Sequence, residues 1–339
     1  MTLRDVAALA GVSVSTVSSV VHGRVCVREE TRRRVQEAVE QLGYRPNLAA
    51  RRLRSGRSRV IGLALPSVTV PYFRDLADAV LRGAGDHGLS VLITQTHGDV
   101  RRERGVCDDP YLRHVDGILL VPVALAEEEA MALSAVKPLV VAASSLGAGR
   151  VHCFDTDSFA AARAVVAHLV ARGRRRIAAL APGEARPAES DVRYQGYVAG
   201  LRDAGLPVCP ERVVSTERVS FASGAAAARA LLGQAPDTDA VFAIGDALAL
   251  GALRGLHEAG RVVPDDIAVA GFGNVAQAAF STPALTTVDP GREELAEGAV
   301  SLLAELTRAR AAGVPLPPAR HHTVGFRLVE RESSGVPAR

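Results

Sequence analysis

The sequence contains no tryptophan and few other aromatic residues, which make up 4% of its 339 residues. Its hydrophobic residues, 48% of the total, are therefore mostly aliphatic, and they suffice for a sizeable core. No apolar run reaches the ~20 residues that a membrane-spanning helix needs, and no apolar export signal follows the first residues. We therefore expect a soluble, cytoplasmic protein with no membrane partner.

Cysteine is also scarce, and its four occurrences are too far apart to form a C-x-x-C pair. They are Cys26, Cys107, Cys153 and Cys209. This spacing indicates neither a zinc site nor a disulfide framework, and we expect reduced thiols. The sequence predicts no metal site and no cofactor.

Patterns typical of enzymes are missing as well. No Ser/His/Asp combination or pair of carboxylates stands out, and His321-His322 is an isolated pair. Gly271-Phe272-Gly273 resembles a nucleotide-binding loop, but it lacks the third glycine and comes late in the chain. We predict no catalytic residues, and an enzyme acting on a nucleotide or a sugar is the alternative from a different functional class.

The formal net charge is only +3, but the charge is unevenly distributed. Residues 1–59 hold 12 basic and 5 acidic residues, whereas residues 60–339 hold 28 basic and 32 acidic ones. A basic segment attached to a mildly acidic body is typical of a module that binds a polyanion such as nucleic acid. A merely solvated arginine-rich surface would give the same count.

The N-terminal segment has the pattern of three short helices. Apolar residues recur over Leu3–Ala10 at the spacing of one helix face. Gly11 supplies a turn, Ser13 is an N-cap residue for a second helix, and Gly23 ends that helix. A third helix is predicted over Glu29–Leu42. Because the second helix carries small hydroxyl residues rather than Glu and Lys, we interpret the segment as a helix-turn-helix and not as an ordinary bundle.

From residue 60 onward, predicted strands and helices alternate. The strands are expected at 60–65, 90–94, 118–123, 139–143, 176–180, 240–244 and 267–272, and the helices at 73–85, 159–171, 192–204, 247–260 and 293–310. Repeated βα units imply parallel sheets covered by helices on both faces. Roughly 270 residues are many for one such sheet, so we predict an α/β core of two doubly wound parallel-sheet lobes with a cleft between them.

Several stretches together resemble one known family. The longest is Thr2-Leu-Arg-Asp-Val-Ala-Ala-Leu-Ala-Gly-Val-Ser-Val-Ser-Thr-Val-Ser, and others are Leu42-Gly-Tyr-Arg-Pro-Asn, Arg193-Tyr-Gln-Gly-Tyr and Gly245-Asp-Ala-Leu-Ala-Leu-Gly. In these stretches, which span almost the whole chain, the sequence resembles the lac repressor (LacI/GalR) family of bacterial transcriptional regulators.

The resemblance implies an all-α helix-turn-helix headpiece, a hinge helix and a core like that of periplasmic binding proteins. The expected boundaries are 1–46 for the headpiece, 47–59 for the hinge helix and linker, 60–331 for the core, 60–157 with 289–318 for lobe 1, 158–288 with 319–331 for lobe 2, and 332–339 for a disordered tail. The tail has no heptad repeat, which favours a homodimer over a tetramer.

The resemblance places Val14, Ser15 and Ser19 at the base-reading positions of the second helix, in the major groove. Val14 can pack on a thymine methyl, and Ser15 can hydrogen-bond a base edge. Ser19 stands where many members have an arginine that grips guanine with two hydrogen bonds. The predicted reading surface is therefore reduced, and specificity would depend more on DNA shape.

Eight residues resemble the family's phosphate contacts, which fix register without reading sequence. They are Thr2, Ser13, Thr16, Ser18, His22, Arg28, Thr31 and Tyr44. His22 replaces the usual Asn, and a lone histidine at a helix end can equally be a cap. Arg28 stands at an expected helix N-cap, where a cation is unfavourable unless a phosphate lies beside it.

The resemblance also implies a hinge that enters the minor groove. Leu53 matches the family's hinge leucine, which would insert at the operator centre and kink the duplex. The alternative is that Leu53 only packs within the linker. The other expected hinge residues are Asn47, Ala50, Arg51 and Arg54.

The fold places an effector site between the lobes, and the resemblance implies that six residues line it. They are Tyr72, Phe73, Arg193, Phe221, Asp246 and Phe272. Three positions depart from the sugar-binding pattern, since Ala143, Gly245 and Gly273 stand where carboxylates or an amide usually hold sugar hydroxyls. The effector could be sugar-like, larger, less hydroxylated, or phosphorylated and held by Arg193.

These observations predict a sequence-specific transcriptional repressor that binds a pseudopalindromic double-stranded DNA operator as a homodimer. A small-molecule effector between the lobes would modulate its affinity for the operator. The nearest rival is a DNA-binding regulator that has no effector.

Overall fold

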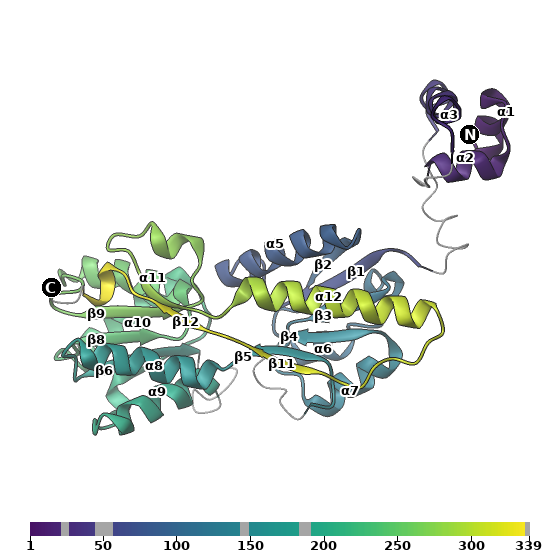
Figure 1. Ribbon diagram of the computed structural model, residues 1–339. Helices are drawn as coiled ribbons and strands as arrows, with labels where there is room; N and C mark the ends of the chain where they lie inside the picture. Colours follow the sequence, from purple (N-terminus) through teal and green to yellow (C-terminus); the bar gives the residue numbers. More distant parts are fainter. Residues whose placement is uncertain (22–26, 45–56, 143–148, 183–190, 336–339) are drawn as a thin grey trace. The chain divides into compact units, whose positions relative to one another are not determined.

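The computed structural model describes residues 1–21, 27–44, 57–142, 149–182 and 191–335. The chain divides into two compact units, Met1–Ser58 and Arg59–Arg339. Each unit is described by itself, and its elements are labelled as in Figure 1.

The first unit contains α1 (Leu3–Ala10), α2 (Val14–Val21) and α3 (Glu29–Gln41). α1 begins with a capping box, in which the Thr2 N–H donates to Asp5 Oδ2 over 2.7 Å and the Asp5 N–H donates to Thr2 Oγ1 over 3.4 Å. α1 ends at Gly11, whose φ of +62° is a left-handed conformation that favours glycine. α1 and α2 meet at a bend of 104°.

The three helices share one small core, as their apolar spacing predicts. It consists of Val6, Ala7, Ala10, Val17, Val20, Val35 and Ala38. The Arg34 guanidinium donates hydrogen bonds to the carbonyls of Ala10 and Gly11, which joins α3 to the turn between α1 and α2. The predicted helix-turn-helix is confirmed.

The second unit contains two six-stranded sheets (Figure 1). The first has the order β11-β5-β4-β3-β1-β2, with all of its pairs parallel. Its strands are β1 (Val60–Leu65), β2 (Ser90–Gln95), β3 (Gly117–Leu120), β4 (Leu139–Ala142), β5 (Cys153–Thr156) and β11 (His321–Val324).

The second sheet has the order β12-β10-β9-β8-β6-β7, and only its β10–β12 pair is antiparallel. Its strands are β6 (Ile177–Pro182), β7 (Val213–Thr216), β8 (Ala240–Ala243), β9 (Ala268–Phe272), β10 (Thr286–Asp289) and β12 (Arg327–Val329). Two mainly parallel sheets confirm the predicted fold class, and each sheet defines one lobe.

Each sheet carries a hydrophobic cluster on either face, because its strands are apolar on both sides. In lobe 1 the helices are α5 (Pro71–Asp86), α6 (Val100–Arg104), α7 (Glu127–Val136) and α12 (Arg292–Ala311). In lobe 2 they are α8 (Ser158–Ala171), α9 (Val192–Asp203), α10 (Phe221–Gln234) and α11 (Asp246–Glu258). Short 3-10 turns lie at Leu112–His114, Pro210–Arg212, Ala276–Ala279 and Glu332–Ser334.

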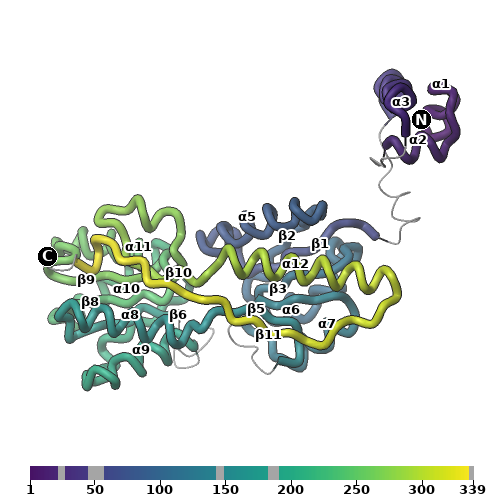
Figure 2. Tube along the Cα trace, viewed as in Figure 1, coloured from purple at the N-terminus to yellow at the C-terminus, as the bar shows by residue number. Residues whose placement is uncertain are grey.

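The chain passes between the lobes three times, after β5, after β10 and after β11 (Figure 2). Residues 321–324, which fall in the range 319–331 that was expected in lobe 2, belong instead to the sheet of lobe 1. β11 pairs there with β5, His321 Nε2 lies 3.0 Å from Asp155 Oδ2, and the His322 ring stacks on Phe154 with centroids 4.8 Å apart. The third crossing therefore lies between β11 and β12.

The expected disordered tail also needs a correction, because its first residues are ordered. Ser333 and Ser334 are buried in lobe 2. The Ser333 hydroxyl donates to the Val269 carbonyl over 2.6 Å and accepts from the Thr286 N–H over 2.8 Å. These bonds attach residues 332–334 to β9 and β10.

Among the described residues, no single helix is both long and apolar enough to cross a membrane. The pair formed by α1 and α2 reaches the required length only in combination, across its 104° bend.

Candidate nucleic-acid interface and effector site

The first turn of α2 exposes an apolar side chain among hydroxyl groups. Val14 is 40% exposed, although Val17 and Val20 on the same helix are buried in the core. Ser15 is exposed and Ser19 is partly exposed. The structure therefore brings the three predicted base-reading residues to the solvent-facing side of one helix.

The hydroxyl groups beside Val14 form a local network. Ser13 Oγ accepts a hydrogen bond from the Thr16 N–H over 3.1 Å, which caps α2 as the sequence predicts. The same oxygen lies 2.7 Å from Ser15 Oγ and 2.8 Å from Thr16 Oγ1. Since hydroxyl groups rotate, these side chains can exchange their mutual bonds for bonds to DNA.

The predicted phosphate contacts lie at several helix ends. Thr2 and Ser13 are exposed at the starts of α1 and α2, and Arg28 is exposed at the N-cap of α3 without a side-chain capping bond. The remaining described candidates are partly buried, and they are Thr16, Ser18, Thr31 and Tyr44.

Several predicted DNA contacts lie outside the described residues. They are His22, Asn47, Ala50, Arg51, Leu53 and Arg54. The departure at Ala143 lies outside them as well.

Arg193 lies at the start of α9, just after the N-cap residue Asp191. Its Nη1 donates to the Ile244 carbonyl over 2.9 Å, and its Nε lies 3.5 Å from Asp191 Oδ1. Its Cζ stands 5.2 Å from the centroid of the Phe272 ring, a cation–π distance. Two predicted effector residues, Arg193 and Phe272, are thus in direct contact.

Tyr72 and Phe73 lie in the first turn of α5 in lobe 1, with an edge-to-face ring contact of 5.5 Å. Tyr72 packs against hydrophobic clusters of both lobes. Its Cδ2 would lie 3.5 Å from a Cβ placed on Gly273 in lobe 2, an ordinary contact distance, so the ring lies directly beside this glycine. Burial raises the pKa of the Tyr72 hydroxyl, while the charges of Arg292 and Arg193 oppose that shift.

Asp246 begins α11 and is only 2% exposed. Its Oδ1 accepts from the Thr287 hydroxyl over 2.5 Å, and its Oδ2 accepts from the Val275 N–H over 2.9 Å. Burial raises the pKa of Asp246 to about 6, against the lowering effect of these hydrogen bonds. Both carboxylate oxygens are engaged within lobe 2, so the structure gives Asp246 a positioning role beside the Phe272–Gly273 turn.

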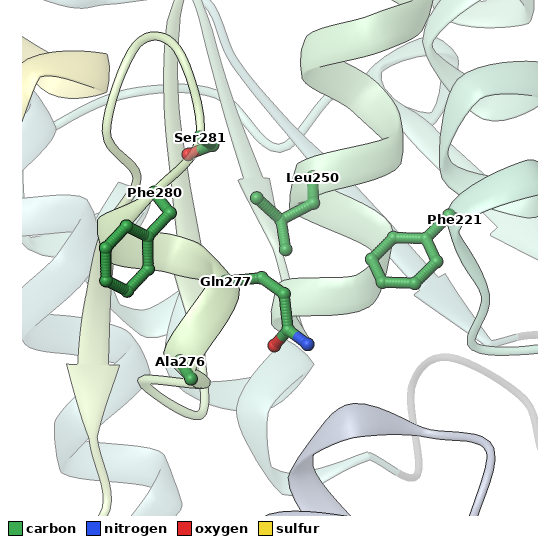
Figure 3. Close-up of a pocket in the computed structure, with 6 residues that line it drawn as sticks. All are labelled: Phe221, Leu250, Ala276, Gln277, Phe280 and Ser281. Carbon is green, nitrogen blue, oxygen red and sulfur yellow. The ribbon is translucent and has the colours of Figure 1, made fainter.

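Phe221 is placed differently from the other effector candidates. It is exposed at the start of α10 and lines a pocket of about 510 Å³ together with Leu250, Ala276, Gln277, Phe280 and Ser281 (Figure 3). None of the other predicted effector residues lines this pocket. The side chain nearest to Gly245, which precedes the effector candidate Asp246, is that of Val219. Its Cγ1 would lie 3.5 Å from a Cβ placed on Gly245.

Arg292 is a candidate that the sequence analysis missed. It is the first residue of α12, and its Nη1 donates to the Gly273 carbonyl over 3.1 Å. A signal was present, because Asp289-Pro290-Gly291 separates a strand from a long helix and so puts Arg292 at the carboxyl edge of the sheet.

Comparisons with known proteins agree with this architecture. Residues 2–47 match the profile of the bacterial regulatory proteins of the lacI family, and residues 166–334 match the profile of the periplasmic binding protein-like domain. The HTH-type transcriptional repressor PurR of Pectobacterium atrosepticum is 34% identical over 309 residues, which cover 89% of both chains. The chain belongs to the lacI family.

Solved structures show the same relationship. A LacI-family transcriptional regulator from Sanguibacter keddieii is 42% identical with a TM-score of 0.73, and the match covers 83% of this chain and 100% of the other. The lac repressor dimer bound to operator and the anti-inducer ONPF is 26% identical with a TM-score of 0.83, over 99% of each chain. The protein is therefore a DNA-binding transcriptional regulator and not an enzyme.

Proposed function

We propose that this protein represses transcription by binding a pseudopalindromic operator as a dimer, with Val14, Ser15 and Ser19 facing the bases. A small molecule that contacts both lobes of the second unit alters its affinity for the operator. The proposal places the protein in the cytoplasm, where bacterial operators are read. The rival proposal is a DNA-binding regulator that has no small-molecule effector.

Val14 is the observation that carries the DNA-reading role. An exposed valine at the start of a short helix is unfavourable in water, and Ser13 and Ser15 beside it leave space for a close approach. Valine can pack on a thymine methyl in the major groove, while serine can donate to or accept from a base edge. The buried Val17 and Val20 hold this surface on a rigid three-helix core.

The distribution of charge supports different roles in DNA binding for two parts of the N-terminal unit. Residues 1–44 hold six arginines and five acidic residues, whereas residues 45–59 hold six arginines and no acidic residue. The basic excess therefore belongs to the linker segment. We propose that this segment supplies most of the phosphate neutralisation and that α2 supplies the base contacts.

We further propose that a second copy of this chain covers the pocket next to Phe221. Phe280 is 87% exposed, and Figure 3 shows Phe280 and Phe221 on opposite sides of the pocket, with Leu250 and Gln277 between them. Gln277 Oε1 is buried without a hydrogen-bond partner among the described residues. An exposed aromatic side chain beside an apolar pocket suits a two-fold interface, since each copy offers both a projection and a recess.

The test begins with selection of bound fragments from genomic DNA, followed by footprinting of the recovered site. Protection of a pseudopalindrome is expected. Each base pair is then varied against the wild type and the Val14→Ala variant. At the position that Val14 reads, a change should weaken wild-type binding by about 1–3 kcal/mol and should weaken the variant much less.

Leu9→Ala is the matched control, because Leu9 is an exposed apolar residue on α1. It should leave the base preferences unchanged. Absence of a protected site, or a Val14→Ala variant whose preferences equal those of the wild type at every position, would contradict the proposed reading surface.

A further inference from the structure

Three polar side chains from different elements converge on the turn that follows β9. Arg193 of lobe 2 lies over the Phe272 ring at 5.2 Å, and Arg292 of lobe 1 donates to the Gly273 carbonyl over 3.1 Å. The Tyr72 ring would touch a Cβ on Gly273 at 3.5 Å. Two guanidinium groups and one phenol are therefore gathered around two adjacent residues.

Both guanidinium groups have hydrogen-bond donors to spare. Arg193 uses Nη1 and Nε for contacts with Ile244 and Asp191, and its Nη2 has no hydrogen-bond partner in the described part of the chain. The Arg292 side chain is 15% exposed, and its buried Nε has no partner there either. Its Nη2 is 4.0 Å from Glu293 Oε1, beyond hydrogen-bond distance.

Two of the neighbouring carboxylates, Asp246 and Asp289, are bonded within the protein through both oxygens. Asp246 accepts from Thr287 and Val275. Asp289 Oδ1 accepts from the Gly291 N–H over 3.1 Å, and its Oδ2 accepts from Asn274 Nδ2 over 3.1 Å. The unused donors of Arg193 and Arg292 therefore lie beside carboxylates that are mostly bonded within the protein, since Asp191 Oδ1 accepts from the Arg193 N–H and Glu293 Oε2 pairs with Arg82.

We propose that the effector carries an oxyanion, either a carboxylate or a phosphate, which binds between Arg193 and Arg292 with the Tyr72 hydroxyl as a third donor. This inference rests on the proposed effector control of operator binding. A guanidinium fork matches the two oxygens of such a group, and charge-assisted bonds are about twice as strong as neutral ones.

A neutral sugar suits this surface less well. A sugar hydroxyl both donates and accepts, so its tight binding needs protein acceptors as well as donors. Gly245 and Gly273 offer no side-chain acceptor, and the Asp246 oxygens are already bonded. A hydroxyl group placed here would meet mainly donors, because the Asp246 carboxyl is buried and bonded within lobe 2.

The experiment titrates the full-length protein with matched pairs of probes by calorimetry. The pairs are ribose with ribose 5-phosphate and glucose with gluconate, and inorganic phosphate is the minimal probe. Ionic strength is held constant with chloride. At least one anionic member of a pair should bind, while its neutral partner does not, and inorganic phosphate should compete with it.

Arg292→Gln should weaken binding of the anionic probe by about 10- to 100-fold, since a hydrogen bond to a charged group is lost. Arg292→Lys, which keeps the charge, should recover part of the loss, and Tyr72→Phe should show a smaller loss. Arg254→Gln is the control, because Arg254 is an exposed arginine of α11 paired with Glu258. Unfolding curves of each variant show whether the fold is retained.

Three results would overturn the inference. The first is binding of a neutral sugar that Arg292→Gln leaves unchanged, and the second is binding of an oxyanion that Arg292→Gln leaves unchanged. The third is no binding of any oxyanion at concentrations up to about 10 mM. Each preparation is also tested for operator binding. A preparation that binds operator but no oxyanion refutes only this inference, whereas failure to bind operator refutes the proposed function itself.

Discussion

The buried carboxyl group of Asp246 gives the sharpest quantitative prediction. Replacement of Asp246 by Asn preserves the size of the side chain but removes its titration. The wild-type carboxyl has a pKa of about 6 in the folded protein, because burial disfavours the charged form. In the unfolded chain an aspartate has a pKa of about 3.9.

The folded protein therefore binds more protons than the unfolded chain between about pH 4 and pH 6. The contribution of Asp246 to stability therefore falls as the pH rises through this window and levels off above about pH 6. Between pH 4.5 and pH 7.5 the two pKa values imply a roughly 25-fold change in the folding equilibrium, or about 2 kcal/mol of unfolding free energy. The Asp246→Asn variant lacks this contribution.

Urea denaturation followed by far-ultraviolet circular dichroism measures the effect, since the chain has no tryptophan for fluorescence. The quantity of interest is the wild-type unfolding free energy minus that of the variant. This difference should be about 2 kcal/mol more favourable to the wild type at pH 4.5 than at pH 7.5. A difference that stays constant across this range, or that changes in the opposite direction, would refute the assignment of a raised pKa to this carboxyl.

Three further predictions concern packing. Phe280→Ala should weaken the dimer by at least about 2 kcal/mol in sedimentation equilibrium, because one aromatic anchor is lost from each copy. The control Phe159→Ala, at an exposed site on α8, should leave the dimer unchanged. If Phe280→Ala also leaves the dimer unchanged, Phe280 is not part of the interface. Gly251→Ala should destabilise the protein by about 1–3 kcal/mol, because its Cβ would collide with the Phe221 carbonyl of α10. Gly233→Ala, with open space around it in α10, should instead stabilise by about 0.5–1 kcal/mol in the same denaturation assay.

Hydrophobic periodicity was enough to predict the elements with strong apolar patterns. The strand at Val60–Leu65 was predicted with its observed bounds, and the helix expected at 293–310 differs from α12 by one residue at each end. Elements with weak patterns were missed. The alanine-rich α10 has too few large apolar residues to show a helical stripe, and β11 begins with two histidines whose strand pairing depends on β5.

For the candidate sites too, features that depend on local sequence could be predicted, whereas features that depend on distant contacts could not. The resemblance to a family was enough to propose a reading helix and Arg193 as candidates, because both proposals depend on local sequence. It could not show that Phe221 lines a separate pocket. The side chain that approaches Gly245 is that of Val219, two residues earlier in the chain. Nor could it show that Asp246 is used internally, because Thr287 is 41 residues away in sequence.

The contacts of α5 suggest how a ligand could act on the arrangement of the lobes. Tyr72 packs against both lobes, and Asp75 Oδ2 of the same helix lies 3.4 Å from the Ala276 N–H of lobe 2. A ligand shifts a conformational equilibrium only through a difference in affinity between the states. A group that contacts Arg193 alone would bind lobe 2 equally well in any arrangement. An oxyanion shared by Arg193 of lobe 2 and Arg292 of lobe 1 would favour the arrangement in which the two guanidinium groups are close, and binding would then change the geometry of the second unit.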